Sequence, residues 1–267
     1  MCGFCDIVNV DKIHLFTDEE VEAYLYGIFT GRISINALDV ASYTKVAEKL
    51  TSGVYKGFGK SILNVDYTTP DYKMLASLRE NVYIFSAAKE YQQVRQMTSL
   101  LTNEKGIKPY NEFKKDALAV HKDYNVNYLS AEYNSAIAQS RSASMWMDIE
   151  KDKGLYPQLQ YSTVGDGRVR IEHARLDGII RPVGDSFWSK YFPPNDWNCR
   201  CTVIQTVGGF DTPKENIPKF NKKEVPEIFR FNAGKERIVY SEKHPYFKVE
   251  PRDKDLAKRN FNLPLPK

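Results

Sequence analysis

The spacing of the apolar residues changes at Gly154, and this change sets the fold class that we expect. Before Gly154, apolar side chains recur every three or four residues, which is the repeat of an amphipathic helix. After it, Leu159, Tyr161 and Thr163 occupy alternate positions, as they would in a half-buried strand. The sequence therefore predicts an α+β protein: a helix-rich N-terminal half, a small α+β module with a β-hairpin, and a proline-rich irregular tail.

The helices of the first half carry recognisable start and stop signals. Thr17 is a candidate N-cap with Glu20 as its capping-box partner, and Gly31 is a plausible stop. Further helices are predicted over residues 36–50, from Pro70 to a stop at Gly106, from Pro109 through His121 and over residues 130–153, with residues 53–60 as a flexible link.

The second half carries strand and turn signals. Asp166-Gly167 lies between two alternating segments and predicts a hairpin, because the turn needs backbone angles that Asp and Gly tolerate. Residues 199–207 are rich in β-branched side chains and predict another strand. The tail is expected to lie against the rest of the chain through its aromatic residues, which include Phe220, Phe229, Phe231, Tyr246 and Phe247. We expect three regions: residues 1–125, 126–210 and 211–267.

The composition and the terminal sequences argue against several classes of protein. The chain has 267 residues and only 4 cysteines, so it is not a disulfide scaffold. No run approaches the roughly 20 apolar residues of a membrane-spanning helix, and the N-terminus lacks the pattern of a secretion signal. We therefore expect a cytosolic protein with no membrane partner. From Asp211 onward there are 14 Lys and Arg against 9 Asp and Glu, so this basic tail could bind DNA or simply be solvated.

His173, Cys199 and Cys201 are the candidate metal ligands. Imidazole and thiolate are ligands that zinc prefers, but this spacing matches no common zinc finger or ribbon. The alternative is that both cysteines are ordinary core residues of a strand. Cys2 and Cys5 could complete a four-cysteine site only if the chain ends meet.

Catalytic signatures are absent from the sequence. It contains no HExxH helix, no phosphate-binding glycine loop and no GxSxG elbow, so we assign no catalytic residue. A metal-dependent hydrolase or nuclease using His173 and the cysteine pair stays open as an alternative. A cysteine nucleophile with His173 as its base is a weaker one.

Several neighbouring residues are given structural roles. Arg168, Arg170 and Asp166 are expected to form an exposed ladder of cross-strand charges. Asp177-Gly178 and Asp185 are expected to shape turns. Trp188 and Trp197 flank Pro193-Pro194 and are expected to hold an irregular loop on the module, since Pro-Pro cannot join a sheet ladder.

Taken in order, these motifs resemble the head-morphogenesis domain of the phage Mu F-like minor head protein family of tailed bacteriophages. The resemblance covers residues 130–207. Its motifs are a D-x-R-x-R element at Asp166, Arg168 and Arg170, an H-x-x-L-D-G element at His173, Asp177 and Gly178, the pair Phe187-Trp188, the turn Pro193-Pro194-Asn195, and a closing C-R-C at Cys199 and Cys201.

The resemblance implies a minor capsid component, present in few copies, that associates with the portal and other head proteins. It would act in head assembly or DNA delivery, in the host cytoplasm during assembly and then in the virion head. The family is not known as an enzyme through this domain. No cofactor is certain, and a structural zinc at His173, Cys199 and Cys201 stays open from the residue types alone. Three hypotheses thus stand: a head protein, a metal-dependent hydrolase or nuclease, and a DNA-binding module that uses the basic tail.

Overall fold

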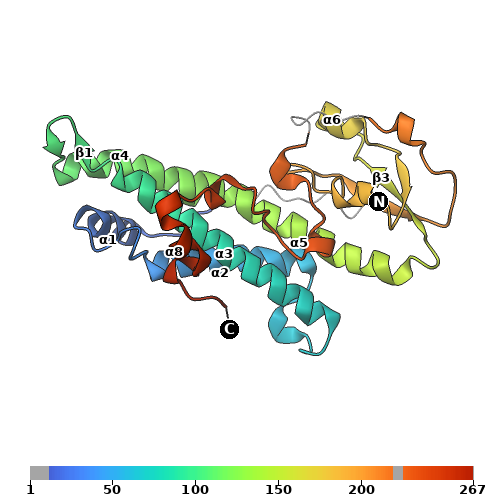
Figure 1. The fold of residues 1–267 in the computed structure, drawn as a ribbon, viewed down its shortest axis with the longest axis horizontal. Coiled ribbons are helices and arrows are strands. Elements are labelled where there is room, and N and C mark those ends of the chain that lie inside the picture. The colour runs from blue at the N-terminus through green and yellow to red at the C-terminus, as the bar shows by residue number, and fades with distance from the viewer. Residues whose placement is uncertain (1–11, 219–224, 267) are drawn as a thin grey trace. The chain divides into compact units, whose positions relative to one another are not determined.

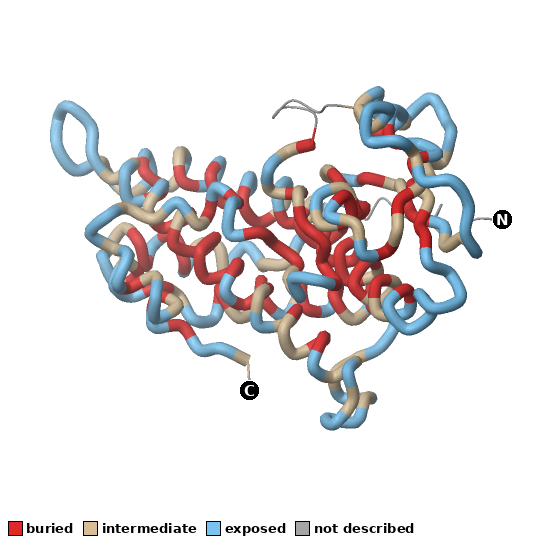
Figure 2. The backbone as a smooth tube through the Cα atoms, turned by 45° about the vertical axis from the view of Figure 1, so that its right-hand side comes forward, coloured by how far each residue is buried: buried red, intermediate tan, exposed pale blue. Residues whose placement is uncertain are grey.

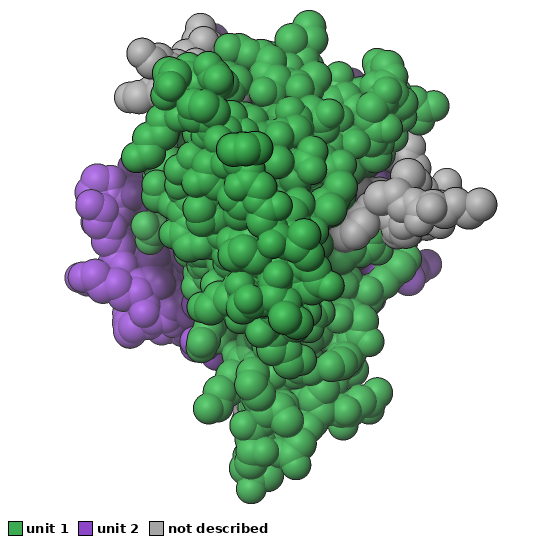
Figure 3. Space-filling view, turned by 90° about the vertical axis from the view of Figure 1, so that its right-hand side faces the viewer, with its two compact units in different colours: residues 1–9, 53–78, 134–243 green, residues 10–52, 79–133, 244–267 purple. Residues whose placement is uncertain are grey.

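The computed structural model describes residues 12–218 and 225–266. These residues form two compact units, each assembled from segments far apart in the sequence (Figure 3). Unit 1 comprises residues 53–78 and 134–243 of the described chain, and unit 2 comprises residues 12–52, 79–133 and 244–266. The division into three consecutive regions stays a prediction.

Five helices of at least three turns dominate the described chain. Two short strands lie between the third and the fourth of these helices, and the other strands follow the fifth, so the predicted α+β class is confirmed (Figure 1). The helices are α1 (Asp18–Phe29), α2 (Val40–Phe58), α3 (Pro70–Thr98), α4 (Tyr110–Lys122) and α5 (Leu129–Asp152). Among the described residues, no helix combines the length and the apolar content that crossing a lipid bilayer requires.

Helix α1 begins as its sequence predicts. The Thr17 hydroxyl accepts a hydrogen bond from the Glu20 amide, and the Glu20 carboxylate accepts one from the Thr17 amide at 2.9 Å. Gly31 follows the helix with a φ of +76°, a conformation that suits glycine. The predicted capping box and stop are both confirmed.

The link predicted at residues 53–60 is wrong, because α2 continues through it to Phe58. The reason is a close helix contact inside unit 1. A Cβ atom at Gly57 would lie 2.1 Å from the Ile137 carbonyl oxygen, so only glycine lets the α2 and α5 backbones meet there. The glycine serves helix packing, and its sequence signal is the same as that of a flexible linker.

The predicted stop of α3 at Gly106 is also wrong, since the helix ends at Thr98. Gly106 instead has a φ of +106° and is the first residue of β2 (Gly106–Ile107), which forms a small antiparallel hairpin with β1 (Thr102–Asn103). Helix α4 then starts after Pro109 as predicted. A π-helical turn (Asp123–Tyr128) joins it to α5.

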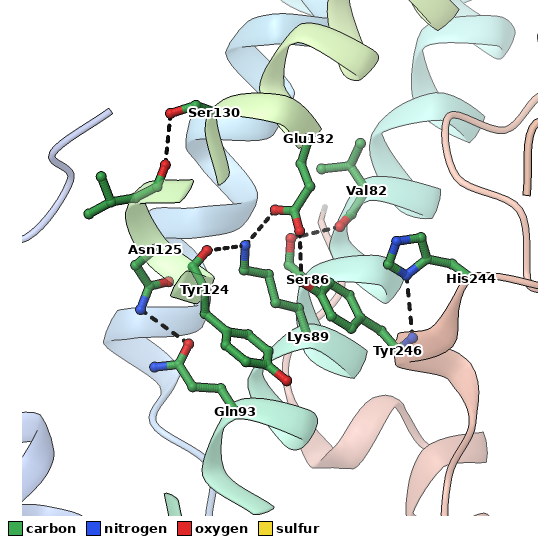
Figure 4. Close-up of polar contacts among 11 residues, drawn as sticks. Val82, Ser86, Lys89, Gln93, Tyr124, Asn125, Ser130, Glu132, His244 and Tyr246 are labelled. Carbon is green, nitrogen blue, oxygen red and sulfur yellow. Dashed lines mark hydrogen bonds and ion pairs between the residues drawn. The ribbon is translucent and has the colours of Figure 1, made fainter. Parts of the chain in front are cut away.

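Unit 2 buries a lysine among oxygen atoms (Figure 4). The Lys89 ammonium donates to the Glu132 carboxylate and, at 2.6 Å, to the Tyr124 carbonyl oxygen in the π-helical turn. The Tyr246 hydroxyl donates to the other Glu132 oxygen at 2.9 Å. Because both charged groups are fully paired, their burial is tolerated.

A second carboxyl group of unit 2 is buried next to this network. Glu90 accepts hydrogen bonds from the Tyr24 hydroxyl at 2.8 Å and from the Ser42 hydroxyl. Burial raises the pKa of Glu90 to about 8, because the charged form loses its hydration. Glu90 is therefore largely protonated at neutral pH.

Unit 1 contains a three-stranded antiparallel sheet in the order β4 (Ile180–Pro182), β3 (Gln158–Ser162) and β5 (Thr202–Thr206). The central strand β3 pairs Leu159 with Gln205 and Tyr161 with Val203. The hairpin predicted at Asp166-Gly167 is wrong, because the chain after it forms the short helix α6 (Ile171–Ala174) instead of a strand.

The core of unit 1 joins the sheet to α5 and to the segment around Trp188. Figure 2 colours the buried residues of the chain red. Its apolar members share nearly complete burial and are Trp146, Ile149, Leu159, Tyr161, Leu176, Ile179, Val183, Phe187, Trp188, Phe192 and Val203. Leu159 and Tyr161 face this core from alternate positions of β3, as their spacing predicts.

Short helical turns connect the rest of the chain. They are Ile62–Asn64, Ser186–Ser189, Lys214–Asn216, Glu227–Phe229, α7 (Ala233–Glu236), Pro245–Phe247, Pro251–Asp253, α8 (Lys254–Lys258) and Asn260–Asn262. Of the tail aromatics expected to pack inward, Phe229, Phe231 and Tyr246 are buried and Phe247 is half-buried. Phe220 lies outside the described residues.

Candidate functional site

One imidazole and two thiols of unit 1 converge. The Nδ1 atom of His173 lies 3.6 Å from the Cys199 sulfur and 3.8 Å from the Cys201 sulfur. His173 and Cys199 are buried and Cys201 is half-buried. Within the described ranges, this is the one group of at least three His, Cys, Asp or Glu side chains arranged to hold a metal ion. The structure thus brings together the three residues that the sequence proposed.

The local backbone explains why both sulfurs can face the same ring. Cys199 and Cys201 precede β5 and lie in a loop, so the strand predicted over 199–207 starts only at Thr202. Asn198 has a φ of +55°, and the Cys199 amide donates to the Asp196 carbonyl oxygen at 3.2 Å. This turn bends the chain before the cysteines, while α6 carries His173 toward them.

The two thiols are unequal. A hydrogen bond from Cys201 holds the pKa of Cys199 well below its usual value, and the neighbouring His173 adds to the effect. The same hydrogen bond, together with burial, raises the pKa of Cys201.

Two ion pairs connect the loop that contains Cys199 and Cys201 to the segment before α6. The Asp166 carboxylate accepts hydrogen bonds at 2.7 and 2.6 Å from both terminal nitrogens of Arg200, the residue between the two cysteines. Arg170 pairs with Asp196 at 3.1 Å. The Arg200 guanidinium lowers the pKa of Asp166 to about 2.

The predicted ladder of cross-strand charges is therefore wrong. Asp166 and Arg170 flank a loop, and no strand follows them that could carry such a ladder. The Asp166 side chain also accepts from the Arg168 amide at 3.0 Å, which stabilises a local turn. The D-x-R-x-R element thus ties one loop to another by long-range pairing.

The H-x-x-L-D-G element joins the candidate metal ligand to the sheet. Leu176 is fully buried in the core, and the Asp177 carboxylate accepts from the Thr163 amide at 2.6 Å, just beyond β3. Gly178 has a φ of +77°, and its amide donates to the Tyr161 carbonyl oxygen at 2.9 Å. The turn predicted at Asp177-Gly178 is confirmed.

The remaining motifs close the loop that leads to the cysteines. Trp188 is fully buried, and Asp185 caps the turn before it by accepting from the Phe187 amide at 2.7 Å, as predicted. The Pro193 carbonyl oxygen, in the Pro-Pro turn, accepts from the Ser142 hydroxyl of α5. The predicted anchoring of this loop by Trp188 is confirmed.

Sequence analysis assigned no partner to four residues of the site, although it named Tyr161 in a strand and Asn195 in a turn. Arg200 and Asp196 make the two ion pairs, and Tyr161 donates through its hydroxyl to the buried Asn195 side chain at 2.8 Å. The position of Arg200 between two candidate ligands, and the place of Asn195 in the Pro-Pro-Asn motif, were usable signals. No local pattern identifies Asp196 or Tyr161.

The imidazole and the two thiols are donors that suit a soft divalent cation, and no carboxylate is among the described residues that line the hollow beside them. A hydrolytic zinc needs an open coordination position and a group that activates water. Glu172, the residue before His173, is a half-buried carboxylate, and Asp177 is engaged by Thr163. Asp166 and Asp196 are engaged by arginines. Among the described residues, the geometry favours binding and cross-linking over hydrolysis.

Comparison with known proteins identifies relatives. The model of the family described as "Phage Mu protein F like protein" matches residues 44–204, which include all three candidate ligands. "Putative capsid assembly protein F" of Escherichia phage Mu is 41% identical over 75 residues, 28% of this chain and 17% of that protein. "Mu-like prophage FluMu F protein" of Haemophilus influenzae is 45% identical over 47 residues, 18% of this chain and 11% of that protein. The alignments thus span under a fifth of either relative, and no solved structure matches significantly.

Proposed function

Because this chain belongs to the phage Mu protein F-like family, we propose that it is a minor head protein of a tailed phage or prophage. It associates with the portal and other head proteins, in the host cytoplasm during assembly and then in the virion head. Its role is in head assembly and in DNA packaging or delivery, and it has no catalytic function of its own.

The observation that carries this proposal is the use made of the family motifs. Asp166 and Asp177 hold loops together, Gly178 makes a turn, and Phe187 and Trp188 fill the core. These residues make their contacts inside unit 1. Such a module is suited to presenting a rigid surface to other proteins, which is what head assembly requires.

The helical region offers surface for a protein partner. Tyr26, Leu118, Ile107 and Tyr128 are large apolar or aromatic side chains of unit 2 that are at least 38% exposed. Aromatic side chains of this kind are enriched where proteins dock. We therefore propose that the portal contact lies on this helical region of unit 2.

Co-expression with the portal protein encoded beside this chain tests the proposal. A complex should co-purify through affinity and size-exclusion steps, and mass spectrometry should find the chain in few copies in assembled heads. Replacing Tyr26 and Ile107 by Ser should weaken the complex, whereas replacing Leu63 of unit 1, which is 88% exposed, should not. Absence of the chain from purified heads, together with no portal complex, would contradict the assignment.

DNA contact through the basic tail is a further part of this proposal. Three tail cations of the described chain already pair with tail carboxylates: Lys243 with Glu227, Arg252 with Asp253 and Lys258 with Asp255. We therefore expect weak, sequence-independent DNA binding that falls steeply with salt concentration. Binding that persists at high salt, or after deletion of residues 211–267, would exclude the tail as the contact.

The convergence of His173 with two cysteines favours one other candidate, a metal-dependent hydrolase or nuclease. Incubating the zinc-loaded protein with plasmid DNA, single-stranded DNA and a chromogenic phosphodiester tests it. We expect no cleavage above that of a Cys199→Ser/Cys201→Ser variant. Turnover that the chelator abolishes and zinc restores would replace the structural assignment.

A further inference from the structure

We propose that His173 Nδ1, Cys199 and Cys201 bind one zinc ion, which acts as a structural cross-link between α6 and the loop before β5. The proposal stands apart from portal binding, because it concerns the internal construction of unit 1. It names a ligand class and a site that the head-protein function does not require.

The distances fit a tetrahedral zinc ion. With Zn–S bonds of about 2.3 Å and a Zn–N bond of about 2.05 Å, a sulfur and a nitrogen that share the ion lie about 3.6 Å apart. The two observed separations from His173 Nδ1 are 3.6 and 3.8 Å. All three donor atoms lie within 4.8 Å of one another, and two sulfurs bound to one tetrahedral zinc ion lie about 3.8 Å apart, so side-chain adjustments of up to about 1 Å bring them to one ion.

Cys201 hydrogen-bonds to Cys199, but this bond does not require both sulfurs to face the same imidazole nitrogen. A neutral imidazole nitrogen either donates one proton or accepts at one lone pair. It can therefore satisfy one thiol in good geometry, whereas Cys199 and Cys201 both lie within 3.8 Å of Nδ1. A cation placed between the three atoms satisfies all of them at once.

The charges around the site are compatible with a cation. Two thiolates neutralise the charge of Zn²⁺. Arg170, Arg200 and Arg168 line the adjoining hollow, but the first two are paired with Asp196 and Asp166. The local field is thus less positive than the three arginines suggest.

In the proposed site, the fourth coordination position of the zinc ion faces this hollow. A water molecule in the hollow is the fourth ligand. The hollow has a volume of about 20 Å³, and its walls include Val164, Val169 and Asn198. One water molecule fits a cavity of that size. Among the described residues that line the hollow there is no carboxylate to deprotonate the bound water, which agrees with a structural role.

The experiment uses the full chain, purified under reducing conditions from cells supplied with zinc. Elemental mass spectrometry should find one zinc per chain. Cobalt substitution should give the intense thiolate-to-metal absorption and the visible bands of a tetrahedral site. Removal of the metal by a chelator should lower the melting temperature by several degrees, and added zinc should restore it.

Paired variants locate the ligands. Cys199→Ser/Cys201→Ser and His173→Gln should each lose the zinc, whereas Cys2→Ser/Cys5→Ser should keep it. The second cysteine pair is the matched control, because it removes the same number of thiols from a part of the chain outside the described residues. If the first double variant fails to fold, cobalt spectra of the wild-type chain and of Cys2→Ser/Cys5→Ser still decide the question.

Three results would overturn the proposal. Wild-type protein without stoichiometric zinc, and with a melting temperature that zinc does not change, would show that no ion binds. Zinc retained in Cys199→Ser/Cys201→Ser but lost in Cys2→Ser/Cys5→Ser would place the ion elsewhere. Rapid alkylation of Cys199 in the presence of excess zinc would show a free reactive thiol paired with His173 in place of a metal ligand.

Discussion

Replacing Lys89 by Met should destabilise the protein far more than the same change at Lys114. Both lysines pair with a glutamate whose other oxygen accepts from a tyrosine hydroxyl, namely Glu132 with Tyr246 and Glu22 with Tyr110. The pairs differ in exposure: the Lys89 and Glu132 side chains are 2% and 3% exposed, and the Lys114 and Glu22 side chains are 37% and 44% exposed. The comparison therefore isolates the effect of burial.

The expected magnitude follows from what Lys89→Met leaves behind. The Glu132 carboxylate would be buried without a cation, and the Tyr124 carbonyl oxygen would lose its donor. Removing one partner of a buried ion pair costs about 3–5 kcal/mol. Protonating a glutamate at pH 7 instead costs about 3.5 kcal/mol, given its usual pKa of about 4.3. For Lys114→Met we expect at most about 1 kcal/mol.

Urea unfolding followed by circular dichroism measures both variants. With an m value of about 3 kcal/mol/M, the midpoint of Lys89→Met should fall by about 1 M or more. The loss should shrink toward pH 5, where protonating the stranded glutamate becomes cheaper by about 1.4 kcal/mol per pH unit. The double variant Lys89→Met/Glu132→Gln should recover part of the stability. Equal losses for the Lys89 and Lys114 variants would refute the reasoning.

Three further predictions follow from single contacts. Gly57→Ala should lower the free energy of unfolding by about 2 kcal/mol or more, because the new Cβ would lie 2.1 Å from a carbonyl oxygen. Gly154→Ala, which has open space around it, should change the free energy of unfolding by less than about 0.5 kcal/mol. The pKa of Glu90 is raised to about 8 from 4.5, so its contribution to stability is full below pH 4.5 and is lost by about 1.4 kcal/mol per unit as pH rises to 8. Glu90→Gln should remove this decline in urea unfolding measured between pH 5 and 8. Tyr161→Phe should cost about 1–3 kcal/mol in thermal unfolding, because it leaves the buried Asn195 oxygen without its donor.

Some features were predictable because the groups involved are close together in the chain. The capping box of Thr17 and Glu20 is completed within three residues, and the turn at Gly178 depends on its own backbone angle. The three candidate ligands were also identifiable, since few residue types can bind a soft metal and these three occur in one short segment. That both sulfurs lie close to the same nitrogen of His173 could not be predicted from the sequence.

Other features depended on contacts with distant segments, which local spacing does not contain. Glycine was taken to predict a linker at Gly57 and a helix stop at Gly106. In the structure, Gly57 packs against α5, and Gly106 begins β2 of a hairpin. Likewise, Asp166-Gly167 has the chemistry of a hairpin turn, but β3 takes β4 and β5 as neighbours, and Asp166 pairs with Arg200. Residue patterns thus established helix starts, fold class and ligand types. Glycine and aspartate allow several backbone conformations, and long-range packing determined which of them forms. The energies of burial and pairing outweigh the weak local preferences of these two residue types.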